Sequence, residues 1–197
     1  TSVPCWSTTA SDGIMEIWAS GFLGVPAYNG SQFIELNATQ AATMFQSFNA
    51  VAGSSAVISF AHRGRSGIDS VEVSIGPVGG PYTSLGRWGD GTTGWGYYTI
   101  PYVLPTNGIY EIRFTPVYSN GGNVGEGNLL DAVSVSVPMS LTLSATPSII
   151  CAGDNSILQI SGVSNFTWST FSTSSNTAVV KNVLQVKLLT PDICSIE

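Results

Sequence analysis

The segment Gly108-Ile109-Tyr110-Glu111-Ile112-Arg113-Phe114-Thr115 decides the fold class of this chain of 197 residues. In an extended strand, Tyr110, Ile112 and Phe114 share one face, and the residues between them share the other. A strand with one apolar face packs that face on a core and leaves the other to solvent. The segment therefore predicts a half-buried β-strand in a layered β-protein.

Segments with the same texture precede and follow it, separated by turns rich in glycine and asparagine. Residues 38–48 also allow a helix, because Ala41, Met44 and Phe45 have helical spacing, but the surrounding β pattern favours a strand over 43–48. Short strands joined by such turns predict a β-sandwich or jelly roll. The predicted strands cover residues 14–18, 32–37, 43–48, 56–62, 70–75, 95–101, 108–117 and 128–137.

The pattern changes after Pro138, where shorter strands are predicted at residues 141–144, 157–161 and 166–169. We therefore expect two all-β domains, over residues 1–137 and 141–197. The second is small for an independent sandwich, and its last part, 181–197, loses the Ser/Thr-rich composition.

Charge and hydropathy exclude several classes of partner. Asp and Glu number 12 against 6 Lys and Arg, so the net charge is −6 and the isoelectric point is about 4.5. Nucleic acid is excluded, because binding phosphates needs a basic stripe. No run of 18 apolar residues occurs, so no membrane insertion is expected. No signal peptide is recognised, and the start at Thr1 is what we expect of a mature or excised fragment.

Three cysteines are too few for a disulfide scaffold, and none lies in a zinc-binding motif. Cys151 and Cys194 could pair within the second domain. Cys5 would then be left over, and we expect it to be a small, buried apolar residue.

Five ordered segments of the first domain resemble the galactose-binding-like jelly rolls of bacterial surface proteins, akin to the DUF642 group. They are residues 3–9, 13–18, 28–37, 59–65 and 130–135. The resemblance spans about residues 1–137 and implies a jelly-roll recognition domain. Such jelly rolls usually open with one more strand, and we expect this sequence to start after it.

Two segments of the second domain, Ile150-Cys151-Ala152-Gly153 and Phe166-Thr167-Trp168-Ser169-Thr170, resemble the Ig-like repeats of Bacteroidetes surface adhesins. The resemblance implies a small Ig-like β-sandwich over 141–197, incomplete at its end, and a secreted or cell-surface location. An incomplete sandwich exposes a sheet edge, and this edge could pair with another chain, so self-assembly through it is an expectation.

No catalytic machinery is recognised. His62 is the single histidine, and it has no serine or cysteine partner in a nucleophile-elbow context. Carboxylates are present, but the sequence does not place any two at the spacing that glycoside hydrolysis needs. We therefore expect a protein that is not an enzyme.

Two loop regions, 62–69 and 87–98, combine aromatic residues with arginine and aspartate among glycines. Saccharides are held by aromatic faces and by bidentate hydrogen bonds from such polar groups. Two alternatives stay open: the tryptophans are buried, and Arg63 and Arg65 pin a loop by pairing with Asp69 or Glu72. The predicted ligand-binding residues are His62, Arg63, Arg65, Asp69, Arg87, Trp88, Asp90, Trp95 and Tyr97.

A structural Ca²⁺ is the one cofactor that the resemblance implies. Asp131, near the start of the last predicted strand of the first domain, stands where these jelly rolls place a ligand, although no Asp-x-Asp-x-Asp-Gly loop is present. The favoured function is non-catalytic binding of a carbohydrate or cell-surface polymer by a bacterial adhesin. The alternatives are a structural subunit of a filament or stalk, and an ancillary module of a glycoside hydrolase.

Overall fold

The computed structural model describes residues 4–137, 142–148, 155–161, 167–168, 177–180 and 186–187. The chain divides into two compact units, Thr1–Val137 with Ile193–Glu197 and Pro138–Asp192. The division falls where the strand pattern of the sequence changes.

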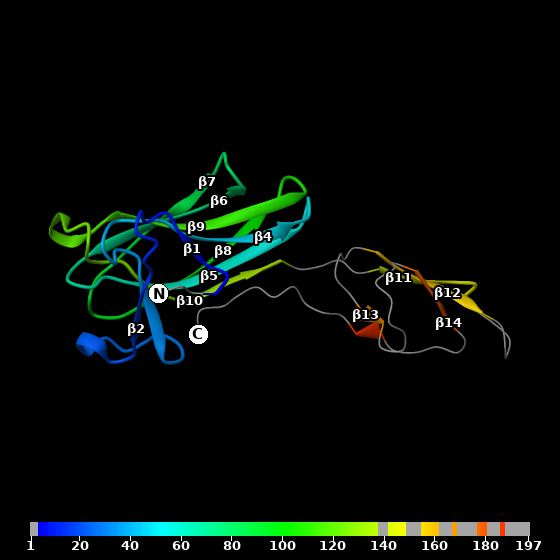
Figure 1. The fold of residues 1–197 in the computed structure, drawn as a ribbon, viewed down its shortest axis with the longest axis horizontal. Helices are drawn as coiled ribbons and strands as arrows, with labels where there is room; N and C mark the ends of the chain where they lie inside the picture. Colours follow the sequence, from blue (N-terminus) through cyan, green and yellow to red (C-terminus); the bar gives the residue numbers. More distant parts are fainter. Residues whose placement is uncertain are drawn as a thin grey trace. The chain divides into compact units, whose positions relative to one another are not determined.

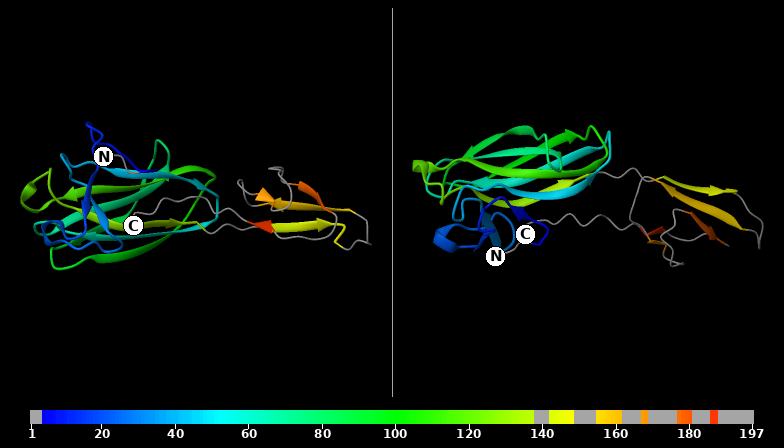
Figure 2. Two further views of the ribbon diagram at one scale, coloured as in Figure 1. Left: turned by 60° about the horizontal axis from the view of Figure 1, so that its bottom comes forward. Right: turned by 45° about the horizontal axis from the view of Figure 1, so that its top comes forward.

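The first unit consists of two five-stranded antiparallel sheets that face each other (Figures 1 and 2). The "β9 sheet" has the order β1 (Ser7–Thr8), β4 (Met44–Ala50), β9 (Gly108–Tyr118), β6 (Asp69–Pro77) and β7 (Thr83–Asp90). The "β5 sheet" has the order β2 (Glu16–Ala19), β3 (Gln32–Glu35), β10 (Leu129–Ser136), β5 (Ser55–Arg63) and β8 (Gly96–Val103). This arrangement confirms the predicted all-β jelly-roll sandwich.

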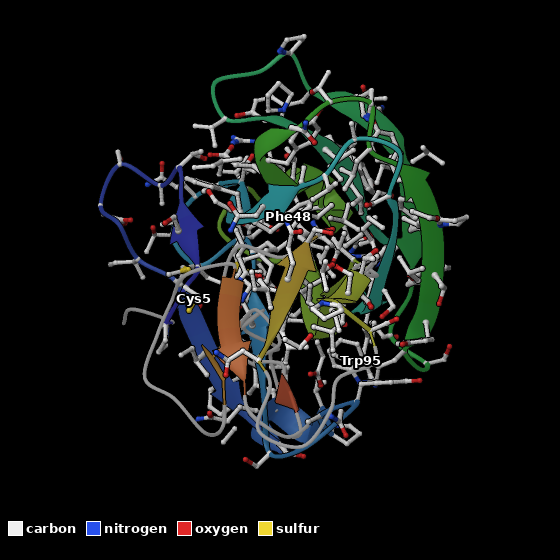
Figure 3. The ribbon with its side chains drawn as sticks, turned by 90° about the vertical axis from the view of Figure 1, so that its right-hand side faces the viewer. Cys5, Phe48 and Trp95 are labelled. Carbon is white, nitrogen blue, oxygen red and sulfur yellow. The ribbon has the colours of Figure 1, made fainter. Side chains whose placement is uncertain are left out.

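The main core lies between these two sheets. Tyr110, Ile112 and Phe114 of β9 are at most 2% exposed, as their alternation predicts, and they meet Ile58 and Phe60 of β5. Burying each of these larger side chains contributes about 1.5–3 kcal/mol. Figure 3 shows the side chains that fill this layer.

The strand predicted over residues 43–48 is β4, and the helical alternative is wrong. β4 pairs with β9 along its whole length, from Met44 opposite Phe114 to Ala50 opposite Gly108.

Strand β7 was not predicted, because Gly86 and Gly89 interrupt its apolar pattern. It forms by pairing with β6. Helical structure in the described residues is limited to the 3₁₀ turns η1 (Phe22–Gly24) and η2 (Asn120–Gly122), and none of these residues forms a helix able to cross a membrane.

A second, smaller core lies on the outer face of the β5 sheet. Phe33 and Leu129 are the chain neighbours of Ile34 and Leu130, which belong to the main core, so they point to the opposite side. Trp18 and Val25 complete this core, which is buried beside the segment 20–31.

The second unit is also built from antiparallel strands. β12 (Ser156–Ser161) pairs with β11 (Thr142–Thr146) and β14 (Thr177–Val180), and β13 (Thr167–Trp168) pairs with β15 (Val186–Lys187). Leu158 and Ile160 of β12 are buried, whereas their neighbours on the strand are exposed. The Ig-like character of this unit stays a prediction, and most of 181–197 lies outside the described residues.

The expectation for Cys5 is wrong. Cys5 is exposed and disulfide-bonded, so it is not the leftover apolar residue. It sits at the start of the chain with a backbone φ of 66°. The other two cysteines, Cys151 and Cys194, lie outside the described residues.

Candidate functional site

His62 does not reach the surface, and the structure places its side chain against other protein groups. Its side chain is 0% exposed, with Nδ1 2.8 Å from Asp90 Oδ2 and Nε2 3.0 Å from Asn128 Oδ1. The other oxygen of Asp90 accepts a hydrogen bond of 2.8 Å from the Tyr98 hydroxyl. Burial and this bond to Asp90 raise the pKa of Tyr98 to about 12. His62 and Asp90 therefore belong to an internal polar chain.

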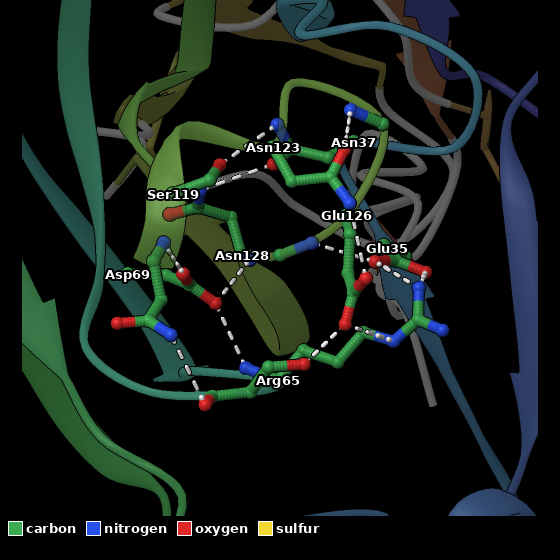
Figure 4. Close-up of polar contacts among 12 residues, drawn as sticks. Glu35, Asn37, Arg65, Asp69, Ser119, Asn123, Glu126 and Asn128 are labelled. Atoms are coloured by element: carbon green, nitrogen blue, oxygen red, sulfur yellow. Dashed lines mark hydrogen bonds and ion pairs between the residues drawn. The ribbon is translucent and has the colours of Figure 1, made fainter.

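Asp69 is also buried, at 1% exposure, and ties two loops together rather than facing a ligand. Its carboxylate accepts hydrogen bonds from the backbone N–H groups of Arg65 at 2.8 Å, Asn120 at 2.8 Å and Asn128 at 3.1 Å (Figure 4). Gly127 packs directly on this carboxylate: a Cβ there would lie 2.9 Å from its carbon, and the φ of +128° also requires glycine.

Arg65 pins a loop, as the alternative interpretation proposed: its guanidinium pairs with Glu35 and Glu126, and its backbone N–H donates to Asp69. Arg65 Nη1 lies 3.0 and 3.2 Å from the two Glu35 oxygens, and its guanidinium lies 4.8 Å from the Trp18 ring centroid. Glu35 also accepts a bond of 2.7 Å from the Gly127 N–H. Burial of Glu35 raises the pKa of its carboxyl to about 7, against the lowering effects of Gly127 and Arg65.

Trp88 and Arg87 point to opposite sides of β7. Trp88 packs into the main core, with its ring centroid 5.3 Å from Phe60 and 5.7 Å from Tyr98, so the buried alternative applies to it. The Arg87 side chain is 68% exposed on the outer face of the β9 sheet, where Nε lies 2.7 Å from Glu72 Oε2.

The outer face of the β9 sheet carries a stack of two aromatic rings around a guanidinium. Arg113 lies 4.9 Å from the Phe45 ring centroid and 4.5 Å from that of Tyr82. Glu111 Oε2 accepts hydrogen bonds from Arg113 Nη1 at 2.7 Å and from the Tyr82 hydroxyl at 2.6 Å. The bond to Glu111 raises the pKa of Tyr82. We call Phe45, Tyr82, Glu111 and Arg113 the Arg113 cluster.

Strand pairing and one glycine assemble this cluster. Phe45 and Ser74 lie on either side of Arg113, in direct register on β4 and β6. Gly76 makes room for Tyr82, because a Cβ at Gly76 would collide with the backbone of Pro81 and Tyr82. The turn that carries Tyr82 can therefore approach the sheet.

The same face continues along β6 beyond the cluster. The Glu72–Arg87 pair lies two residues further along β6, and Ser70 two residues beyond it, opposite Tyr118. Tyr118 is 52% exposed. Four residues along a strand span about 13 Å, so aromatic side chains stand near both ends of a polar strip.

Phe45, Tyr82, Glu111 and Arg113 were not predicted as site residues. The two-residue alternation of β9 could have indicated two of these residues, since it places Glu111 and Arg113 together on the face away from the core. The proximity of Tyr82 could not be read from a turn sequence.

Trp95 and Tyr97 come together on the opposite side of the sandwich, outside the β5 sheet. The Tyr97 ring stacks on Tyr28, which was not predicted, with centroids 5.3 Å apart. Trp95 is half-buried beside them, away from Phe48 and the main layer of side chains (Figure 3). Arg63 donates a hydrogen bond from Nη2 to the Thr92 carbonyl.

Asp131 is 0% exposed, and backbone N–H groups occupy both of its carboxylate oxygens. Oδ2 accepts from Tyr28 at 2.7 Å and Asn29 at 3.1 Å, and Oδ1 accepts from Ala132 at 2.6 Å. Burial raises the pKa of Asp131, opposed by these three bonds. The part of the chain that the structure describes contains no cluster of three or more His, Cys, Asp or Glu able to hold a metal. The calcium site stays a prediction.

No protein-family model matches the sequence, and no curated protein matches it. Among solved structures, the C-terminal family 22 carbohydrate-binding module of Clostridium thermocellum Xyn10B is 16% identical, with 69% of this chain and 87% of that chain covered and a TM-score of 0.51. The CBM22-1–GH10 modules of C. thermocellum xylanase 10B with xylohexaose are 12% identical, with 68% and 26% covered and a TM-score of 0.50. The TmCBM61 structure with β-1,4-galactotriose is 13% identical, with 68% and 90% covered and a TM-score of 0.47. Because the sequence identities are this low, the similarities to the two Xyn10B structures show a shared jelly-roll fold and no more.

Proposed function

We propose that the first unit is a non-catalytic carbohydrate-binding module, and that a glycan chain lies along the outer face of the β9 sheet. The observation that carries the proposal is the aromatic–guanidinium–aromatic stack of Phe45, Arg113 and Tyr82 beside an acceptor, Glu111.

The chemistry of this face suits a sugar. A sugar ring has C–H-rich faces, which pack on aromatic side chains, and hydroxyl edges, which need paired donors and acceptors. Tyr82 and Tyr118 offer the first, and the exposed pair Arg87–Glu72 offers the second. Glu111 is only 6% exposed and holds Arg113 and Tyr82 in place. The length of the strip fits an oligosaccharide segment better than one monosaccharide.

Preorganisation supports binding by this cluster. The Tyr82 ring lies on the Arg113 guanidinium and its hydroxyl donates to Glu111, so two contacts already restrict its rotamer. Ordering a flexible side chain at an interface costs about 0.5–1.5 kcal/mol, and this site avoids much of that cost. Tyr82 is still 37% exposed and available to a ligand.

The favoured context is a secreted adhesin. The disulfide of Cys5 supports an oxidising compartment, because such bonds are rare in the cytosol. The second candidate is an ancillary module of a glycoside hydrolase, and it is favoured by the similarity to the CBM22-1–GH10 structure, in which such a module accompanies a GH10 module. Self-assembly through an incomplete sheet edge stays a further proposal, and a monomeric mass at high concentration would contradict it.

The test is a glycan array followed by titration calorimetry with the best oligosaccharide. We expect Tyr82→Ala to lower affinity by about 5–30-fold, equivalent to about 1–2 kcal/mol, and Tyr82→Phe to lose less because it keeps the ring. Ile68→Ala is the matched control, since Ile68 is 61% exposed in the loop between β5 and β6. Absence of any glycan hit would favour the structural filament or stalk, and unchanged binding by Tyr82→Ala would reject this face.

A further inference from the structure

Two exposed tyrosines from distant parts of the chain stack on the outer face of the β5 sheet. The rings of Tyr28 and Tyr97 are 5.3 Å apart at an interplanar angle of 4°, and the residues are 45% and 49% exposed. The Arg113 cluster lies on the other sheet of the sandwich, so neither face can share a ligand site with the other.

A buried carboxylate holds Tyr28 in this position. Asp131 accepts hydrogen bonds from the backbone N–H groups of Tyr28 and Asn29, more than 100 residues earlier in the chain. The register of β10 with β5 shifts directly after Asp131, and Ala132 has a φ of 47°, unusual for a residue with a Cβ. Such bulges re-aim a side chain, and here the bulge accompanies an aspartate that anchors the Tyr28 loop.

A second anchor comes from Trp95. Its Nε1 donates a hydrogen bond of 2.9 Å to the Pro26 carbonyl, two residues before Tyr28. Its ring packs edge-on against Phe33 of the small core, with centroids 5.6 Å apart. The tyrosine pair is thus preorganised from two sides, which lowers the entropy cost of binding a ligand.

On the Ser59 side of the stack, the next two rows of the sheet present hydroxyl groups and no ionised side chain at the surface, whereas Arg63 lies on the other side of Tyr97 and donates from Nη2 to the Thr92 carbonyl. Register places Ser59 beside Thr99 on one side and Ser134 on the other, in the row adjoining Tyr97. The following row holds Pro101, Val57 and Ser136. The single carboxylate of these rows, Asp131, is fully buried. The β9 sheet, in contrast, carries the ion pairs Arg113–Glu111 and Arg87–Glu72.

We propose that the Tyr28–Tyr97 stack is a second glycan-binding site, that it takes neutral sugars, and that the first unit is therefore bivalent. The aromatic face and the hydroxyl row match the C–H face and hydroxyl edge of a sugar. The two rows on the Ser59 side hold no ionised side chain at the surface and give no counter-charge to a uronic acid or a sulfated sugar, and the Arg63 guanidinium on the other side donates to the Thr92 carbonyl. Two sites on opposite sheets let one module bridge two polysaccharide chains.

The experiment uses the full chain in affinity gels containing soluble galactan, mannan or β-glucan as neutral probes. We expect Tyr28→Ala and Tyr97→Ala each to weaken retention by the bound neutral polysaccharide about tenfold. Each substitution should also abolish the precipitation of that polysaccharide by the wild-type protein, because bridging needs both sites. Ile68→Ala is the surface control, and circular dichroism verifies the fold of every variant.

The outcomes separate this site from the one on the β9 sheet. If only Tyr82→Ala weakens retention, the second site is rejected and the proposed function stands. If only the Tyr28 and Tyr97 variants weaken it, the second site stands and the Arg113 cluster is rejected. Wild-type protein that is retained by none of the three gels overturns the neutral-glycan proposal, as does stronger binding to polygalacturonate that depends on Tyr97.

Discussion

Ionisation of Glu35 is expected to make the first unit less stable as pH rises from about 5 to 8. The Glu35 side chain is fully buried and its pKa is raised to about 7, from 4.5 for the unperturbed group. The folded state therefore holds a proton at pH values where the unfolded chain has released it. Stability is highest below the unfolded pKa and falls as pH rises through the folded pKa.

The magnitude follows from that difference. The two pKa values differ by 7 − 4.5 = 2.5, and about 1.4 kcal/mol per pKa unit gives an upper limit of about 3.5 kcal/mol lost by pH 8. Arg65 opposes the loss by pairing with the ionised carboxylate, while Glu16 adds to it through like-charge repulsion.

The assay is urea unfolding of wild type and Glu35→Gln between pH 4.5 and 8.5, with the disulfide intact. The difference in unfolding free energy isolates Glu35 from the other titrating groups. We expect the variant to gain stability relative to wild type as pH rises. Glu126→Gln is the control, because Glu126 also faces Arg65 but is 31% exposed. A difference that does not change with pH, or that moves in favour of wild type, would refute the reasoning.

Two further substitutions test the loop anchors. Gly127→Ala should lower the unfolding free energy by about 2–3 kcal/mol in urea titrations, because its Cβ would meet the Asp69 carboxylate at a φ of +128°; a loss below 0.5 kcal/mol would contradict this packing. Asp131→Asn should lower stability by about 1–3 kcal/mol and weaken retention by the neutral polysaccharide while Tyr97 is intact. Calorimetric melting with a chelator tests the predicted calcium site: that prediction implies a clear drop in melting temperature, and an unchanged melting temperature would contradict it.

Several features of the candidate sites were not predicted from the sequence. Glycines around Trp88 indicated an exposed loop, yet Trp88 lies on β7 and packs into the main core. His62, at the end of the strand predicted over 56–62, is fully buried. A glycine in a strand marks a close approach as readily as a loop, and the approach partner is set by pairing. Trp95 and Tyr97 were predicted to face a ligand, but their partner Tyr28 lies about 70 residues earlier and is held beside them by hydrogen bonds to Asp131 and between Trp95 and Pro26.

The sequence by itself determined the local pattern of the first unit. A period of two assigned Tyr110, Ile112 and Phe114 to the core and Glu111 and Arg113 to the opposite face, because successive side chains of a strand alternate. Tertiary structure alone decided which strands became neighbours. The guanidinium of Arg113 lies between two rings because β9 pairs with β4 and because the turn after β6 returns over Gly76. Alternation specifies a face, whereas a binding site needs several faces brought together, and long-range pairing supplies that.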